Sequence, residues 1–227
     1  MAISRENESP RHEVIIIGAG VCGIYQLYRL LELGIDVTVL EAGGGPGGTW
    51  YWNRYPGCRF DSESYTYGYS FSKELLEEWD WSEHFAGQPE TLRYLNHVVE
   101  KFDLRRHMQF NCKVDSAVFD DDASYWTLQL ADGRTLTTRF LLTAIGMLSA
   151  PTMPLIEGVA SFEGEAYHTY YWPQEPVDTA ASSRPRRPRT SGPSMSRKPT
   201  GIPSCPRPSP GSPATIPTSP ATTSCAT

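Results

Sequence analysis

The first 40 residues combine short apolar runs with an apolar pattern of helical period. Residues 14–17 are β-branched or apolar throughout, which favours a strand buried on both faces, as in a parallel sheet. Apolar residues then recur at helical spacing between Ile24 and Leu33, and Gly34 is suited to end a helix. Residues 35–40 predict the next strand. A strand, a helix and a strand within about 30 residues predict a βαβ unit.

The middle of the chain predicts a loop, two helices and several strands. Residues 42–69 are rich in glycine and aromatic residues and favour a loop, and helices are predicted over 72–79 and 89–102. Alternating positions and the hairpin signal D-G at 132–133 predict strands over residues 109–114, 116–120, 125–130 and 135–143. The predicted fold class is α/β: a Rossmann-like parallel sheet with an inserted β-meander over residues 109–143.

The last 49 residues differ in composition from the rest. They contain 11 prolines, many Ser, Thr and Arg, no Leu and no aromatic residue. Such a segment buries too little apolar surface to offset the entropy lost on ordering. We expect disorder from about residue 178 onward, and also over the polar residues 1–10.

Charge and cysteine content narrow the classes of function. Seven of the 20 Lys and Arg fall in residues 179–227, so residues 1–178 carry 13 basic and 26 acidic side chains. This acidic body argues against nucleic acid as a partner. The five cysteines form no C-x-x-C pair and no zinc-like spacing, so we expect no metal site and reduced thiols in a cytoplasm. The N-terminal region shows no apolar signal segment and no membrane-spanning run, so no membrane association is expected.

Residues 18–23 have the sequence G-A-G-V-C-G, which is a G-x-G-x-x-G motif between a predicted strand and a predicted helix. Gly18 would permit the tight turn, Gly20 would let the backbone approach a diphosphate, and Gly23 would let helix and strand pack closely. Glu41 follows the second predicted strand and is suited to accept hydrogen bonds from ribose hydroxyls. The alternative is a glycine-rich turn with a solvated Glu. The motif does not separate FAD from NAD.

Two further segments resemble Baeyer–Villiger flavin monooxygenases, a family that includes the phenylacetone and cyclohexanone enzymes. The sequence G-G-T-W-Y-W-N-R-Y-P-G at 47–57 is similar to the family's second flavin-contacting segment. Residues 162–173 match the family pattern F-x-G-x-x-x-H-x-x-x-W-P at Phe162, Gly164, His168 and Trp172. The resemblance covers roughly residues 11–178.

The resemblance implies a reaction with FAD, NADPH and O2. NADPH reduces FAD, and one oxygen atom of O2 is inserted next to the carbonyl of a small-molecule ketone to give an ester or lactone. The cofactor supplies the difficult chemistry, and the protein positions it. A related flavin monooxygenase that oxidises nitrogen or sulfur is the alternative, which the complete 162–173 pattern disfavours. The ketone and the oligomeric state stay open.

The resemblance also implies roles for residues around the cofactor. Gly18, Gly20, Gly23 and Glu41 would hold the ADP half of FAD, and Gly48 belongs to the second flavin segment. Trp50 and Tyr67 would lie near the flavin, and the backbone of Val114 would meet the adenine. The alternatives are a core aromatic for Trp50, an exposed loop aromatic for Tyr67 and an ordinary strand residue for Val114.

The segment C-R-F-D at 58–61 carries the implied catalytic residue. Asp61 would orient an essential active-site Arg, and a solvated loop Asp is the alternative. Arg59 and Phe60 would contact the nicotinamide coenzyme. His168 and Trp172 would lie on the linker that coordinates movement of the FAD and NADPH domains, whereas direct proton transfer by His168 is less favoured.

Beyond residue 178 the sequence departs from the family, which continues into a second βαβ unit that binds NADPH. We expect a frameshift in the underlying gene, because the Pro- and Arg-rich composition begins in mid-domain; a natural disordered tail is the alternative. The domain prediction is an incomplete FAD-binding domain over 11–150, an interdomain linker over 151–178 and a frameshifted tail over 179–227. The chain as written is then expected to be an inactive fragment, at most an FAD-binding module without the NADPH domain.

Overall fold

A computed structural model describes residues 11–173 and 175–177 of the 227-residue chain. The residues up to Trp172 belong to one compact unit, and a second unit, Pro173–Pro213, contributes only its first few described residues. The predictions for residues 1–10 and for the tail from 178 onward lie outside the described residues. No helix in the described part is long and apolar enough to cross a membrane.

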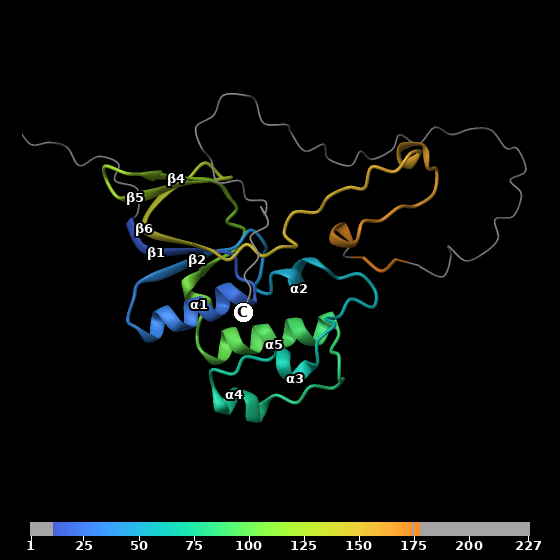
Figure 1. Cartoon of the computed structure of the whole chain (residues 1–227), viewed down its shortest axis with the longest axis horizontal. Helices are drawn as coiled ribbons and strands as arrows, with labels where there is room; N and C mark the ends of the chain where they lie inside the picture. The colour runs from blue at the N-terminus through green and yellow to red at the C-terminus, as the bar shows by residue number, and fades with distance from the viewer. Residues whose placement is uncertain (1–10, 174, 178–227) are drawn as a thin grey trace, which may run out of the picture. The chain divides into compact units, whose positions relative to one another are not determined.

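A six-stranded mixed sheet forms the centre of the fold, in the order β3-β2-β1-β6-β5-β4 (Figure 1). Its parallel part pairs β3, β2, β1 and β6, and its antiparallel part pairs β6, β5 and β4. The strands are β1 (Arg11–Ile17), β2 (Val37–Leu40), β3 (Met108–Gln109), β4 (Val114–Asp120), β5 (Tyr125–Leu130) and β6 (Thr135–Thr143).

The predicted βαβ unit is confirmed. Helix α1 (Val21–Glu32) connects the parallel strands β1 and β2, and Gly34 follows it with a φ of +72°. Consecutive residues of β1 belong to two different apolar clusters, one on each face of the sheet. Ile16 packs in the cluster that includes residues of α1, and Ile15 packs in the cluster that includes residues of β5 and β6. Burial on both faces explains why residues 14–17 of this strand are all apolar.

The β-rich region differs from the prediction in two respects. Residues 109–114 are not one strand, because β3 ends at Gln109 and Asn111 takes a positive φ of 53° before β4 begins. In addition, β6 is more than a hairpin partner of β5: residues 135–138 pair with β5, while residues 137–143 pair in parallel with β1. The meander is therefore continuous with the parallel sheet.

Helices fill the region between β2 and β3 and cover one face of the parallel strands (Figure 1). The expected helices near 72–79 and 89–102 are confirmed as α4 (Lys73–Glu78) and α5 (Gln88–Lys101). The predicted loop also contains two short helices, α2 (Thr49–Trp52) and α3 (Ser64–Tyr67). Three 3-10 helices complete the described part: η1 (Arg105–His107), η2 (Val159–Ser161) and η3 (Thr169–Tyr171).

The register of the parallel strands places their carboxyl ends side by side. Ile17 of β1 is aligned with Leu40 of β2 and with Thr143 of β6. The Gly18 amide donates to the Leu40 carbonyl at 2.8 Å, and the Ala144 amide donates to the Ile17 carbonyl at 2.8 Å. The segments that follow these strands therefore meet at one edge, which is the usual ligand-binding position in open α/β sheets.

Candidate cofactor site

A cavity of about 540 Å³ lies at this carboxyl edge. It is bordered by the glycine loop after β1, the end of β2, helix α2, the start of β4 and the segment after β6. Seven of the predicted cofactor-binding residues line it: Gly18, Gly20, Glu41, Gly48, Trp50, Tyr67 and Val114. The structure thus brings together residues that are spread over almost one hundred positions of the sequence.

Two glycines of the G-x-G-x-x-G motif are required by the fold itself. Gly18 has a φ of +102°, and a Cβ on it would lie 2.6 Å from the Ala144 carbonyl oxygen. A Cβ on Gly23 would lie 1.9 Å from the Gly18 carbonyl oxygen. Gly23 does not line the cavity, so its function is the close packing of helix and strand.

Gly20 differs from the other two because the protein leaves room for a side chain there. A Cβ on Gly20 would meet no atom nearer than Gly48 Cα at 3.5 Å, which is ordinary van der Waals contact. Gly20 is also the N-cap of α1, and no described side chain caps that helix end. The amides of the first helical turn are thus available to an anionic group.

The second glycine segment packs directly on the first. The Gly47 amide donates to the Ala19 carbonyl at 2.8 Å. Gly48 has a φ of +52°, and a Cβ on it would lie 2.7 Å from Gly20 Cα. The spacing G-x-G-x-x-G also recurs at residues 43–48, but there it is followed by the four-residue helix α2 and not by a long helix. Residues 47–48 therefore form part of the cavity wall directly beside the loop that precedes α1.

Glu41 is a buried carboxylate that the backbone holds in a fixed orientation. Its side chain is 5% exposed, and its two oxygens accept hydrogen bonds from the Ala19 and Gly43 amides, each at 2.7 Å. An ionised carboxylate has about four acceptor positions, so further donors can still bind. Sequence reasoning treated a solvated Glu as the alternative, and the burial of Glu41 contradicts that alternative.

Trp50, Phe60 and Tyr67 form an aromatic cluster beside the cavity. The Trp50 indole donates to the Tyr67 hydroxyl at 2.7 Å, and the Phe60 and Tyr67 rings stack with centroids 4.3 Å apart. Burial raises the pKa of Tyr67, while the hydrogen bond from Trp50 opposes this. Trp50 is therefore both a core aromatic and a lining residue, and Tyr67 is a half-buried residue of α3.

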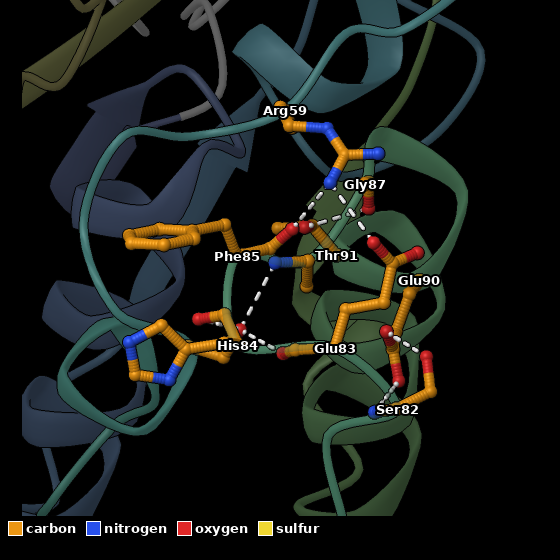
Figure 2. A network of polar contacts seen from close by, with 10 residues as sticks. Arg59, Ser82, Glu83, His84, Phe85, Gly87, Glu90 and Thr91 are labelled. Carbon is orange, nitrogen blue, oxygen red and sulfur yellow. Dashed lines mark hydrogen bonds and ion pairs between the residues drawn. The ribbon is translucent and has the colours of Figure 1, made fainter.

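The segment at 58–61 lies outside the cavity lining. Phe60 is buried in the aromatic cluster, and Asp61 is exposed. Arg59 is held in a polar network, shown in Figure 2, in which its guanidinium contacts Glu83 at 2.9 Å and the Phe85 carbonyl at 3.0 Å. Phe60 packs against the predicted cofactor residues Trp50 and Tyr67. None of the three residues 59–61 lines the cavity itself, and their implied roles stay predictions.

The same network fixes the segment that carries Arg59. Ser82 binds the buried carboxylate of Glu90 through its amide at 2.9 Å and through its hydroxyl at 2.6 Å (Figure 2). Arg59 also forms an isolated antiparallel bridge with Gly87 at the N-terminus of α5. The position of residues 58–61 is thus set by α5 and by the segment that precedes it.

Val114 and its neighbours border the cavity at the start of β4. Val114 is buried and Lys113 pairs with Asp115 at 2.8 Å. Cys112 is a buried thiol whose pKa is raised by burial, and its sulfur accepts from Arg134 at 3.4 Å. Val114 is thus a strand residue that also lines the cavity, and its contact with the adenine stays a prediction.

The residues of the 162–173 pattern show mainly local contacts. A Cβ on Gly164 would lie 2.4 Å from the Phe162 ring, and Phe162 itself is 63% exposed. His168 precedes η3, and its Nδ1 accepts from the Tyr170 amide at 3.2 Å. The Tyr167 and Trp172 rings lie 5.4 Å apart. None of the four pattern residues lines the cavity.

Sequence reasoning missed Trp52, Ser149 and Tyr170, which all line the cavity. The Tyr170 ring stacks on Trp52 with a centroid separation of 5.8 Å. The aromatic residue at 170 occupies a variable position of the 162–173 pattern, so the pattern gave no signal for it.

Comparison with known proteins places these features in a family. Residues 16–78 match the model of an NAD(P)-binding Rossmann-like domain. An acetone monooxygenase (methyl acetate-forming) from Gordonia sp. strain TY-5 is 48% identical over 168 residues, covering 74% of this chain and 32% of that protein. The phenazine N-monooxygenase PhzNO1 from Lysobacter antibioticus is 44% identical over 171 residues, covering 75% and 32%.

Solved structures agree with these relatives. The crystal structure of OTEMO in complex with FAD and NADP aligns with a TM-score of 0.68 and 48% identity, covering 73% of this chain and 31% of that one. The chain thus spans about one third of the length of the relatives that it matches. Over that shared part, which is the N-terminal part of each relative, the chain belongs to the Baeyer–Villiger-type flavin monooxygenases.

Proposed function

We propose that the cavity binds FAD and that this chain is the FAD-binding part of a Baeyer–Villiger-type monooxygenase. The observation that carries the proposal is Gly20: the fold tolerates a side chain there, yet the position is glycine and faces the cavity. A bound diphosphate close to the backbone explains that choice. The OTEMO structure contains both FAD and NADP, so it supports FAD as one of the two nucleotides that a relative binds.

The lining residues suit the successive parts of FAD. The amides at the start of α1 would bind the diphosphate, since Gly20 leaves the approach open. Glu41, already oriented by two amides, would accept hydrogen bonds from ribose hydroxyls. Val114 would border the adenine, and Trp50 and Tyr67 would border the flavin ring.

The reaction that we propose is oxygen insertion next to the carbonyl of a small-molecule ketone. Bound FAD, reduced by NADPH, supplies the activation of O2. The acetone monooxygenase that forms methyl acetate supports a ketone as the substrate class. In this reaction Asp61 would orient an active-site Arg, and the 162–173 segment would connect the FAD and NADPH domains.

Oxygenation at nitrogen is a second candidate. It is supported by the phenazine N-monooxygenase, which is 44% identical over 171 residues. The FAD site would be the same in both cases. Product analysis with a ketone and with an aromatic N-heterocycle, in an active protein that carries residues 11–172, would separate the two candidates.

We further propose that the 227-residue polypeptide binds FAD but does not oxygenate ketones by itself. The G-x-G-x-x-G loop at 18–23 supplies one nucleotide site at the cavity, and hydride transfer requires NADPH held against the flavin as well. The test is titration of the purified chain with FAD and with NADPH, followed by an assay of ester formation from cyclohexanone with both cofactors. Tight NADPH binding without FAD binding would contradict the cofactor assignment, and ester formation would contradict the predicted inactivity.

A further inference from the structure

Tyr170 connects the 162–172 segment to the wall of the cofactor cavity. Its ring stacks on Trp52 with an interplanar angle of 12°, and its hydroxyl donates to the Ser149 carbonyl at 3.2 Å. All three residues line the cavity. Tyr170 is thus a contact between the 162–172 segment and the cavity wall.

His168 sets the geometry of this contact. Its Nδ1 accepts from the Tyr170 amide, which fixes the turn that begins η3. The adjacent Tyr171 is 60% exposed and does not line the cavity. Of the two neighbouring tyrosines, the turn therefore directs only Tyr170 toward the cavity.

The phenol of Tyr170 is neutral and partly desolvated. Its pKa is raised by burial, then by Tyr171, and then by the carboxylate of Glu41. Glu41 and Tyr170 both line the cavity. A neutral phenol can donate the observed hydrogen bond to Ser149 while its ring stays packed on Trp52.

We propose that Tyr170 is a cofactor-binding residue that closes the cavity over FAD at the place where its ring stacks on Trp52. This inference rests on the proposed FAD site. It gives the 162–172 segment a function within the FAD domain: through His168 and Tyr170, occupation of the cavity by FAD stabilises the docked position of the segment.

The test compares Tyr170→Ala and Tyr170→Phe with Tyr171→Ala as the matched control, all in the full 227-residue chain. FAD affinity is measured by quenching of flavin fluorescence. Loss of the stacked ring should weaken FAD binding about tenfold in Tyr170→Ala. Tyr170→Phe and Tyr171→Ala should each bind within about twofold of the wild type.

A second measurement separates this role from a general structural one. Without FAD, all three variants should melt within a few degrees of the wild type, because Tyr170 is only half-buried and η3 contains no fully buried residue. FAD should protect residues 151–172 from limited proteolysis in the wild type and in Tyr170→Phe, but much less in Tyr170→Ala.

Three outcomes would overturn the inference. Equal FAD affinity in Tyr170→Ala and the wild type would show that the ring does not contact the cofactor. Tighter binding in Tyr170→Ala would show that the ring obstructs the cavity. Absence of FAD binding in the wild type would refute the proposed function, and this inference would fall with it. The titration of the wild type distinguishes this outcome from the other two, in which the wild type binds FAD.

Discussion

Replacing Gly20 with alanine tests the proposed cofactor site directly. The chain offers a matched control, because Gly20 and Gly87 are both N-cap residues with nearly the same backbone conformation. Gly20 precedes α1 with φ −80° and ψ −172°, and Gly87 precedes α5 with φ −79° and ψ 163°. A Cβ on Gly20 would lie 3.5 Å from its nearest neighbour, and one on Gly87 would lie 3.7 Å away.

These distances predict similar effects of the two substitutions on stability. Each new methyl group makes ordinary contacts, so the cost is that of an N-cap change from glycine to alanine, about 1 kcal/mol or less. For a chain of this size, that cost lowers the melting temperature by about 2–4 °C. Both variants should therefore fold.

FAD binding should distinguish the two variants, because only Gly20 lines the cavity. A methyl group on Gly20 would hold the diphosphate away from the first amides of α1. Loss of one hydrogen bond to a charged group costs about 2 kcal/mol, which corresponds to about 30-fold weaker binding. Gly87→Ala should bind FAD as the wild type does.

The assay combines thermal unfolding without FAD and titration of flavin fluorescence. Equal FAD affinity in Gly20→Ala and Gly87→Ala would refute the reasoning. A loss of several kcal/mol of stability in Gly20→Ala alone would also refute it, because Gly20 would then be required by the fold and not by a ligand.

Three further substitutions give distinct expectations. Glu41→Gln should lower the free energy of unfolding, measured in urea, by about 1–3 kcal/mol and should weaken FAD binding. The reason is that the amide side chain cannot accept hydrogen bonds from both backbone amides as the carboxylate does. An unchanged urea midpoint would contradict this. Asp61→Ala should change the free energy of unfolding by less than about 0.5 kcal/mol, since Asp61 is exposed. The same substitution should sharply lower ester formation in an active enzyme of this family that carries the same segment. Hydrogen bonds from Lys101 and His97 lower the pKa of Glu78, so its contribution to stability is present at neutral pH and is lost as the pH falls through the pKa of the folded state. The urea midpoints of the wild type and Glu78→Gln should therefore differ at pH 7 and converge in acid, and a difference independent of pH would refute this.

The sequence alone determined the βαβ unit and the order of the main helices. Burial of β1 on both faces requires an unbroken apolar run, and α1 requires apolar residues on one side only, so each element leaves its own periodicity in the sequence. The motif at 18–23 and Glu41 were identifiable for the same reason, because their spacing follows from the local geometry of a strand, a turn and a helix.

The motif predicts a tight turn at Gly18, close approach of a ligand at Gly20 and helix packing at Gly23, and the tertiary structure shows which atoms constrain each position. Gly18 and Gly23 are constrained by Ala144 and by each other, whereas Gly20 faces Gly48 at a distance that would tolerate a side chain. The constraint on Gly23 is local to the motif. The contacts of Gly18 with Ala144 and of Gly20 with Gly48 depend on segments more than 20 residues away, which local periodicity does not encode.

The same physical reason explains the remaining differences between sequence and structure. The place of β6 in the centre of the sheet depends on pairing with β1, which lies more than 100 residues earlier in the chain. The contact of Tyr170 with Trp52 also depends on packing between segments that are distant in the sequence. Such contacts form because the parallel sheet brings the carboxyl ends of its strands together, and they leave no periodic signal in the sequence.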